Sequence, residues 1–484
     1  MAVPKIFSNS IIYTGVTVLQ RCVSFFLLPL YTTYLTPSDY GITGVVGSVS
    51  GLLSIFTTLG LTAACSRFYY KHKGDEEYSK RLFGTVGIAI LISSAIFGGI
   101  FILAHRWIID PLVGEISFYP YVLLGLLNVL VTPLYTLFQG YLQTIQNGFK
   151  FGVNSILYFL LQVGLTIYFV TVLKTGALGV LTANLITAVV FFIYVIFTFF
   201  RHQNLKIDKS ILKESYLYSL PLLPHSLANW SNGALDKLLV NGVRSEADAG
   251  RYNLGQQYSS VMDTITVAIN NAYVPWFFDK ANDIKNNLNQ IQRMSEMINY
   301  AVCFISIIMS LFSQEVLGIM ISNPAYDGVW RVTPLIISGI IFNSIYFFYV
   351  NVLFLNNTGT VFTITVSTIV VNIGLNIWLI PIMGYMGCGV AVLATYFTKS
   401  VIAVFISMKK NKEIRFRTIL LFSTGIISGL ICISALYLSQ LTMMLSLLIK
   451  ISIVTILATL LIRRYKSELN NLIQPFFDKI RREV

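Results

Sequence analysis

The chain has 484 residues, of which 55% are hydrophobic and only 11% are charged. A water-soluble protein carries roughly 25% charged residues, so this composition excludes a soluble globular domain and requires lipid to cover much of the apolar surface. The net charge of +13 requires no nucleic-acid partner, because basic loops facing anionic lipid headgroups account for it.

Apolar segments long enough to cross a bilayer recur along the whole chain. They lie near residues 10–34, 41–64, 82–104, 118–142, 151–173, 177–200, 216–240, 250–275, 296–320, 331–354, 361–382, 389–408, 418–440 and 443–462. The sequence therefore predicts an all-α polytopic membrane protein with about fourteen transmembrane helices. The segments 216–240 and 250–275 are the most polar of these. No predicted loop exceeds roughly 20 residues, which leaves no room for a soluble catalytic domain.

Positive charge is distributed unevenly between the predicted loops. With the N-terminus in the cytoplasm, the cytoplasmic loops and tails hold about 25 Lys and Arg residues and the outer loops about five. This bias predicts a multi-pass protein with both termini in the cytoplasm. Residues 465–484 place apolar side chains at helical spacing between Lys and Arg. This pattern is typical either of an amphipathic helix on the membrane surface or of a solvated tail.

Three sequence patterns recur at an offset of about 209 residues. The pairs are Thr36-x-x-Asp39-x-Gly41 with Ser245-x-x-Asp248-x-Gly250, Gln162-x-Gly164 with Asn372-x-Gly374, and Gly176-x-x-Gly179-x-x-x-Ala183 with Gly384-x-x-Gly387-x-x-x-Ala391. In the first pair, a Ser or Thr followed three residues later by an acid predicts a helix N-cap. The offset spans an even number of predicted helices, so the two halves share one orientation in the membrane.

The repeat predicts how the chain is organised. We expect an N-terminal lobe (1–205), a C-terminal lobe (206–412), an extra helix pair (413–464) and a cytoplasmic tail (465–484). Two like-oriented lobes with a cleft between them are the architecture of alternating access.

Polar side chains fall on one face of the two most polar predicted helices. These side chains are His225, Asn229, Asn232 and Asp236 in the first, and Gln256 and Asp263 in the second. Such stripes predict a shared polar interior, although stripes of this kind also hold helices together. We therefore predict that these six residues couple transport to an ion or line the interior. His225 and Asp263 are able to titrate, while a structural role is the commoner one for a histidine such as His225.

Basic residues also lie inside the predicted spans. Each costs roughly 3 kcal/mol at the bilayer centre, which a water-filled cavity, a nearby acid or an anionic ligand would offset. Cations outnumber acids at this depth, which suits a substrate that carries phosphate groups. The candidate substrate-binding residues are Arg21, Lys237 and Lys399.

The remaining chemistry-bearing residues are interpreted as structural. The five cysteines form no CxxC pair and the four histidines show no metal-ligand spacing, so we expect neither a metal site nor a cofactor. Lys450 also lies inside a predicted span and needs the same compensation for its charge unless it snorkels or faces lipid, and Glu315, near an outer helix end, is expected to be solvated.

Two segments resemble a known family. The segment 29–42 (PLYTTYLTPSDYGI) closely resembles the hallmark after the first helix of Wzx-type polysaccharide flippases, which belong to the multidrug/oligosaccharidyl-lipid/polysaccharide exporter superfamily. The segment 384–391 (GYMGCGVA) resembles that family's glycine-rich turn before the twelfth helix. The layout of two six-helix halves plus two helices agrees, so the resemblance covers essentially the whole chain.

The resemblance implies a transporter and not an enzyme. Such proteins move an undecaprenyl-diphosphate-linked oligosaccharide from the cytoplasmic to the outer leaflet of the bacterial inner membrane, for O-antigen, capsule or a related exopolysaccharide. Members of the family have a cationic lumen that admits the lipid diphosphate, and Arg21, Lys237 and Lys399 are the candidates for it here because of their position in the predicted spans, not because of a motif match. The implied partners are this glycan, membrane lipids, a glycan polymerase and glycosyltransferases, with H⁺ or Na⁺ as the coupling ion.

Three other functions are weighed against this one. The first is a cation-coupled multidrug-type antiporter of the same superfamily. The extra helix pair and the excess of basic over acidic residues inside the predicted spans argue against it. The second is a lipid II-type flippase, whose early helices carry several arginines, whereas here Arg21 has no second arginine in the following helix. The third is a membrane enzyme, which would need a long outer loop or an acidic surface site.

Overall fold

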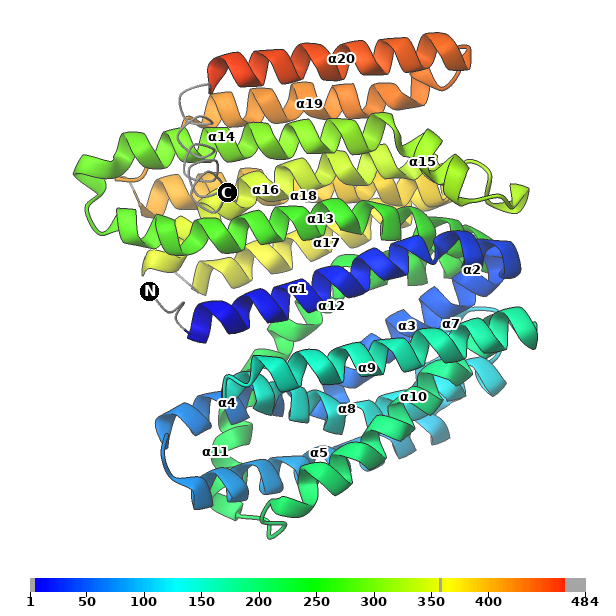
Figure 1. Cartoon of the computed structure of the whole chain (residues 1–484), viewed down its shortest axis with the longest axis vertical. Coiled ribbons are helices and arrows are strands. Elements are labelled where there is room, and N and C mark those ends of the chain that lie inside the picture. The colour runs from blue at the N-terminus through cyan, green and yellow to red at the C-terminus, as the bar shows by residue number, and fades with distance from the viewer. Residues whose placement is uncertain (1–4, 357–358, 412, 466–484) are drawn as a thin grey trace, which may run out of the picture. The chain divides into compact units, whose positions relative to one another are not determined.

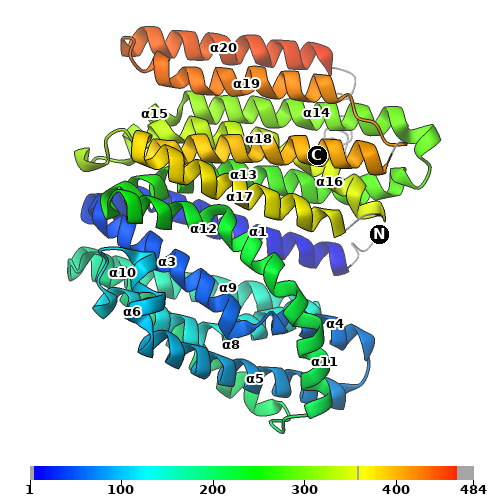
Figure 2. The same ribbon diagram turned by 180° about the vertical axis from the view of Figure 1, so that it is seen from behind.

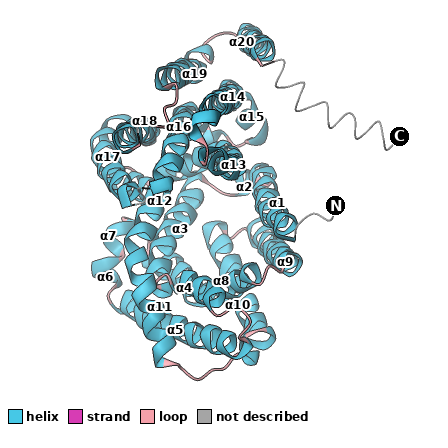
Figure 3. Cartoon of the chain, turned by 90° about the vertical axis from the view of Figure 1, so that its left-hand side faces the viewer, coloured by secondary structure: helices cyan, strands magenta, loops and turns pink. Residues whose placement is uncertain are grey.

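The computed structural model describes residues 5–356, 359–411 and 413–465, and within these ranges it contains helices and no strand (Figure 3). Among the described residues, 11 helices are long and apolar enough to cross a membrane, or 12 when the bent pair Gly15–Phe26 and Leu28–Tyr34 counts as one span. The all-α polytopic fold is confirmed. The predicted spans 216–240 and 250–275 form helices, but these helices are too polar to be counted among the membrane-crossing ones.

The chain divides into two compact units. Unit 1 comprises residues 1–254, 321–327 and 376–385, and unit 2 comprises residues 255–320, 328–375 and 386–484. The helices α13 (Glu246–Ala281), α17 (Gly359–Met383) and α18 (Tyr385–Lys410) each contribute to both units. The predicted tail, apart from Tyr465, lies outside the described residues.

Unit 1 contains the helices of the first half of the chain (Figure 1). They are α1 (Lys5–Phe26), α2 (Leu28–Tyr34), α3 (Pro37–Thr58), α4 (Leu61–Lys71), α5 (Glu76–Leu103), α6 (His105–Ile108), α7 (Asp110–Val113), α8 (Leu123–Thr144), α9 (Gly148–Ile167), α10 (Gly176–Thr198), α11 (Lys209–Ser219) and α12 (Leu223–Val243). Apolar side chains of α4, α5, α8 and α10 form its core, in which Phe83 and Phe138 are fully buried. Helix α3 packs on α5, α8 and α12.

The two predicted N-caps are present. Thr36 forms a capping box with Asp39: its side chain accepts from the Asp39 N–H, and the Asp39 carboxylate accepts from the Thr36 N–H. In the second half, the Ser245 hydroxyl accepts from the N–H of Asp248 at 3.2 Å. Each cap satisfies a backbone donor that the first turn of a helix leaves without a partner.

The acid of each cap lies beside a glycine of the third repeated pattern. The Asp39 carboxylate accepts from the Ala177 N–H at 2.8 Å, next to Gly176, whose φ is +59°. The Asp248 carboxylate lies 3.9 Å from the position of a Cβ on Gly384, whose φ is +61°. Positive φ favours glycine at both positions. The sequence repeat is therefore also a repeat of local structure within unit 1.

Unit 2 contains the remaining helices (Figure 2). Besides its parts of α13, α17 and α18, they are α14 (Ile284–Leu311), α15 (Ser313–Met320), α16 (Thr333–Asn356), α19 (Thr418–Leu438) and α20 (Met443–Arg464). The span Pro324–Leu355, which contains most of α16, has 94% of its apolar stretch buried, whereas only 11% of the apolar stretch of α20 is buried. Helices α19 and α20 lie side by side in both views, and both pack on α14.

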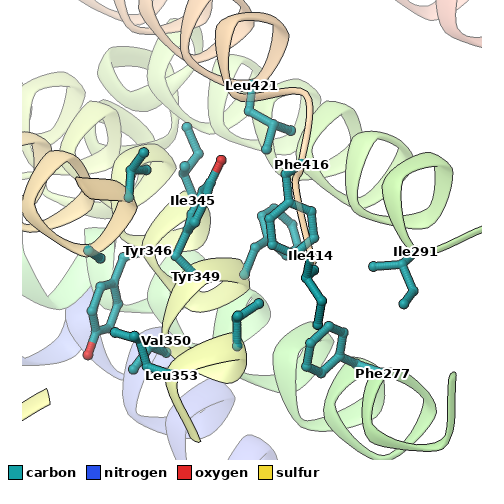
Figure 4. Close-up of a cluster of buried hydrophobic side chains, with 14 of the residues drawn as sticks. Phe277, Ile291, Ile345, Tyr346, Tyr349, Val350, Leu353, Ile414, Phe416 and Leu421 are labelled. Carbon is teal, nitrogen blue, oxygen red and sulfur yellow. The ribbon is translucent and has the colours of Figure 1, made fainter. Parts of the chain in front are cut away.

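The core of unit 2 surrounds the second half of α16 (Figure 4). Tyr349 and Leu353 pack against Phe416 and Leu421, and Phe277 of α13 joins the same cluster. The hydroxyls of Tyr346 and Tyr349 point to opposite sides of this cluster. The Tyr349 hydroxyl lies 2.8 Å from Thr418 Oγ1, so a buried polar atom finds a partner. The Tyr346 ring instead lies beside the ammonium group of Lys399.

Candidate functional site

The candidate residues fall into both units. Unit 1 holds Arg21 of α1 and His225, Asp236 and Lys237 of α12, whereas unit 2 holds Gln256, Asp263 and Lys399. Asn229 and Asn232 lie in α12, but their side chains are outside the described part of the chain. Each unit brings together one polar cluster.

Asp236 is the centre of the polar cluster in unit 1. The Tyr252 hydroxyl donates to Asp236 Oδ2 at 2.8 Å, and Asn376 Nδ2 donates to Asp236 Oδ1 at 2.8 Å. All three side chains are buried, with Asp236 2% exposed. A buried carboxylate is costly unless hydrogen bonds satisfy it, and here both oxygens accept one. Three helices, α12, α13 and α17, therefore converge on one acid.

The cations of unit 1 differ in exposure. Lys237 follows Asp236 in α12, is half-buried, and feels the charge of that carboxylate. Arg21 and His225 are exposed. The neighbouring carboxylate of Asp236 offsets part of the cost of placing the Lys237 charge in a half-buried position.

Lys399 is the centre of the polar cluster in unit 2. Its Nζ donates to Asn343 Oδ1 at 3.1 Å and lies 4.0 Å from the ring centroid of Tyr346. The ring of Tyr396 is also within reach, at 5.6 Å from the same nitrogen. The negative charge of Asp263 on α13 acts on the ammonium group as well. An amide oxygen, a ring face and a nearby acid together stabilise the Lys399 cation within the helix bundle.

The Lys399 cluster has a chemistry suited to an anionic group. An ammonium group has three N–H donors, and one of them is used by Asn343. Electrostatic attraction between a lysine and phosphate oxygens is strong when the lysine is partly withdrawn from water. Neither unit offers a metal centre, since no group of three His, Cys, Asp or Glu side chains converges among the described residues.

Several partners of these residues were not predicted from the sequence. Asn343 and Tyr346 are three residues apart on α16, so helical spacing placed them on one face, but nothing in the sequence paired that face with Lys399. No sequence pattern near Tyr252 or Asn376 indicated that these residues bind Asp236. Their contacts join segments far apart in the chain, such as the 140 residues that separate Asn376 from Asp236.

The expectation that Glu315 is solvated was wrong, because Glu315 pairs with Lys450. Lys450 is fully buried, and its Nζ lies 2.6 Å from Glu315 Oε1. Lys450 therefore neither snorkels nor faces lipid, and the Glu315 carboxylate is one half of an ion pair. The residues are 135 positions apart, on α20 and α15. A buried Lys–Glu pair of this kind has a structural explanation and requires no ligand.

The sequence model of one protein family, described as "Polysaccharide biosynthesis protein", matches residues 6–280 of the chain. Two proteins of Haemophilus influenzae are similar in sequence. "Lsg locus putative protein 1" is 25% identical over 328 residues, which cover 65% of this chain and 76% of that protein. An "Uncharacterized membrane protein" is 25% identical over 298 residues, which cover 60% of this chain and 70% of that protein.

Two solved structures of membrane transporters are similar in fold to this chain. The lipid II flippase MurJ in an inward closed conformation has a TM-score of 0.73, with 14% identity, covering 94% of this chain and 99% of that one. An inward-facing multidrug resistance transporter of the MATE family has a TM-score of 0.57, with 16% identity, covering 81% and 94%. Both proteins carry a transporter fold and not an enzyme fold, and at this identity the likeness concerns the fold alone.

Proposed function

The chain belongs to the polysaccharide biosynthesis protein family, and on that premise we propose that it is a flippase for a lipid-linked oligosaccharide. The substrate is an undecaprenyl-diphosphate-linked repeat unit, which the protein moves from the cytoplasmic to the outer leaflet by alternating access. The product then serves the synthesis of an O-antigen, a capsule or another exopolysaccharide. A whole-chain fold shared with a lipid flippase supports this assignment.

The Lys399 cluster is the observation that carries the proposal. A half-buried ammonium group lies over an aromatic ring within a helix bundle, where it would attract a diphosphate headgroup. We propose Lys237 and Arg21 of unit 1 as further residues that bind diphosphate, Lys237 because it is also half-buried and Arg21 because a guanidinium binds phosphate oxygens in pairs.

The acids take a second role in this proposal. Asp236 accepts two hydrogen bonds in unit 1, and Asp263 balances Lys399 in unit 2. We propose that these acids, together with His225, couple transport to the movement of H⁺ or Na⁺. Asn229, Asn232 and Gln256 complete the polar interior. No metal or organic cofactor enters this scheme.

The protein is a multi-pass membrane protein. We propose that it resides in the cytoplasmic membrane with both termini in the cytoplasm, because the basic loops then face the cytoplasm. Its substrate is made by glycosyltransferases and its product is extended by a glycan polymerase, and these enzymes are the proposed partners in the cell.

Surface glycan in a strain that lacks the gene tests the function. Expression of the wild-type protein should restore the glycan, and Arg21→Ala, Lys237→Ala or Lys399→Gln should not, at equal membrane abundance. Lys410→Gln is the matched control, because Lys410 lies in the exposed last turn of the helix that carries Lys399. Normal glycan in all three lumen variants would remove the cationic mechanism, and failure of the wild-type protein would remove the function.

Two alternatives are supported by the fold neighbours. A lipid II-type flippase would restore cell-wall synthesis in cells depleted of their own lipid II flippase. If expression of this protein does not restore cell-wall synthesis in such cells, the alternative is rejected. A cation-coupled multidrug antiporter would drive efflux of a cationic dye from proteoliposomes under a proton or sodium gradient. The cationic Lys399 cluster argues against a cationic cargo, because like charges repel in a site of low dielectric.

A further inference from the structure

An apolar groove opens along three helices of unit 2, away from the Lys399 cluster. It has a volume of about 570 Å³ and lies between α14, α19 and α20. The residues that line it include Tyr300 of α14, Ile427 of α19, and Leu457, Arg463 and Arg464 of α20. The lining is apolar over its length and basic at one end, and the volume is within the range of small-molecule sites.

Ion pairs at the two ends of the helix pair α19–α20 hold the walls of the groove. At the basic end, Glu296 of α14 pairs with Arg417 at 3.3 Å and with Arg464 at 3.8 Å. Toward the other end of α20, Lys450 pairs with Glu315 at 2.6 Å. These contacts tie α20, which is otherwise little buried, to α14 and α15. The groove is therefore preformed and does not depend on a ligand to separate its walls.

The two arginines at the basic end differ in what they contact. Arg464 lies over the ring of Tyr300 at 4.9 Å and pairs with Glu296. Arg463 is exposed, lines the groove, and makes no hydrogen bond or ion pair with any residue that the structure describes. One guanidinium group is thus used within the protein, while its neighbour presents a positive charge at the mouth of an apolar groove.

We propose that this groove binds an anionic glycerophospholipid of the cytoplasmic leaflet, with an acyl chain between α14, α19 and α20 and the phosphate on Arg463. The positive-inside orientation places Arg463 at the cytoplasmic surface, where anionic headgroups lie. The part of α20 that lines the groove, from Leu457 to Arg464, is about 10 Å long, which fits within one leaflet. A single phosphodiester matches Arg463, the groove arginine that makes no hydrogen bond or ion pair with any described residue.

Lipid binding to the full-length purified protein tests this site, and it does so independently of the flippase function. Phosphatidylglycerol and phosphatidylcholine with identical acyl chains are titrated in detergent and followed by native mass spectrometry. We expect phosphatidylglycerol to bind about fivefold more tightly, the effect of about one basic contact. Arg463→Gln should remove this preference, and Ile427→Trp, which places a large ring in the groove, should weaken both lipids.

A matched control separates the groove from general surface charge. Lys410→Gln removes an exposed cation near the end of α18, outside the groove, and should leave the preference unchanged. Arg463→Gln should also leave the unfolding temperature unchanged, because the side chain is exposed.

Four results would overturn the proposal. Equal affinity of the wild-type protein for the two lipids would do so, as would an undiminished preference in Arg463→Gln. Displacement of phosphatidylglycerol by the undecaprenyl-diphosphate-linked oligosaccharide would assign the groove to the transported lipid. Lipid binding that appears only after residues 466–484 are removed would assign it to the chain's own tail.

Discussion

Gly41 of α3 and Gly250 of α13 lie against one another's helices, at the point where the two repeated Ser/Thr-x-x-Asp-x-Gly patterns meet within unit 1. A Cβ atom on Gly41 would overlap the carbonyl oxygen of Glu246, and a Cβ atom on Gly250 would overlap the carbonyl oxygen of Pro37. Both overlaps are with backbone atoms, which cannot rotate away. The Ser/Thr-x-x-Asp-x-Gly pattern therefore requires its glycine for close approach of the two helices and not for a special backbone angle.

This contact predicts that both glycines are intolerant of even a methyl group. Gly41→Ala and Gly250→Ala should each lower the free energy of unfolding by about 2 kcal/mol, because the helices must separate. Thermal unfolding of the purified protein measures the effect. Gly47→Ala is the control, because no atom lies within 4 Å of its Cβ position on the same helix α3. Equal stability of all three variants would contradict the contact.

The Asp236 cluster predicts a large effect from one hydroxyl. Tyr252→Phe removes a hydrogen bond to a buried carboxylate and should destabilise the protein by about 2 kcal/mol. Tyr437→Phe removes a hydroxyl from a side chain that is 71% exposed and should have no effect. Unfolding in detergent distinguishes the two variants, and a Tyr252→Phe protein as stable as the control would show that the Asp236 carboxylate does not depend on this bond.

The Lys450–Glu315 pair predicts a non-additive response. Lys450→Met alone leaves the buried Glu315 charge without its partner and should cost about 3–5 kcal/mol, whereas Lys450→Met combined with Glu315→Met should cost less than either single change. A double-mutant cycle on the unfolding free energy measures the coupling. Additive losses would mean that the two side chains do not stabilise each other.

The sequence allowed the helices to be predicted because length and hydropathy act locally. The cap at Thr36 and its counterpart at Ser245 were predicted for the same reason, since a capping box lies within four residues. The polar helices α12 and α13 were the least certain spans, and their polarity is what keeps them below the criterion for a membrane helix. A helix packed against other helices does not need to be apolar on every face.

The partners of the charged residues could not be predicted, because they lie far away in the chain. Lys399 was a candidate by its depth in a span, but Asn343 and Tyr346 became its partners only through the packing of α18 on α16. The same separation concealed Glu315 from Lys450, and an isolated lysine in a span gave no reason to prefer a protein partner over lipid. Charge at membrane depth identifies a residue of interest, and only the fold identifies its partner.

Transbilayer movement of a purified substrate tests the central claim most directly. The protein is reconstituted in liposomes with a fluorescent undecaprenyl-diphosphate-linked oligosaccharide, and the fraction accessible to an impermeant quencher is followed over time. We predict that the wild-type protein and Lys410→Gln move the lipid at the same rate, and that Lys399→Gln is slower by about tenfold, the loss of one charge-assisted contact. A wild-type rate equal to that of protein-free liposomes, or a Lys399→Gln rate equal to that of the wild type, would contradict the account.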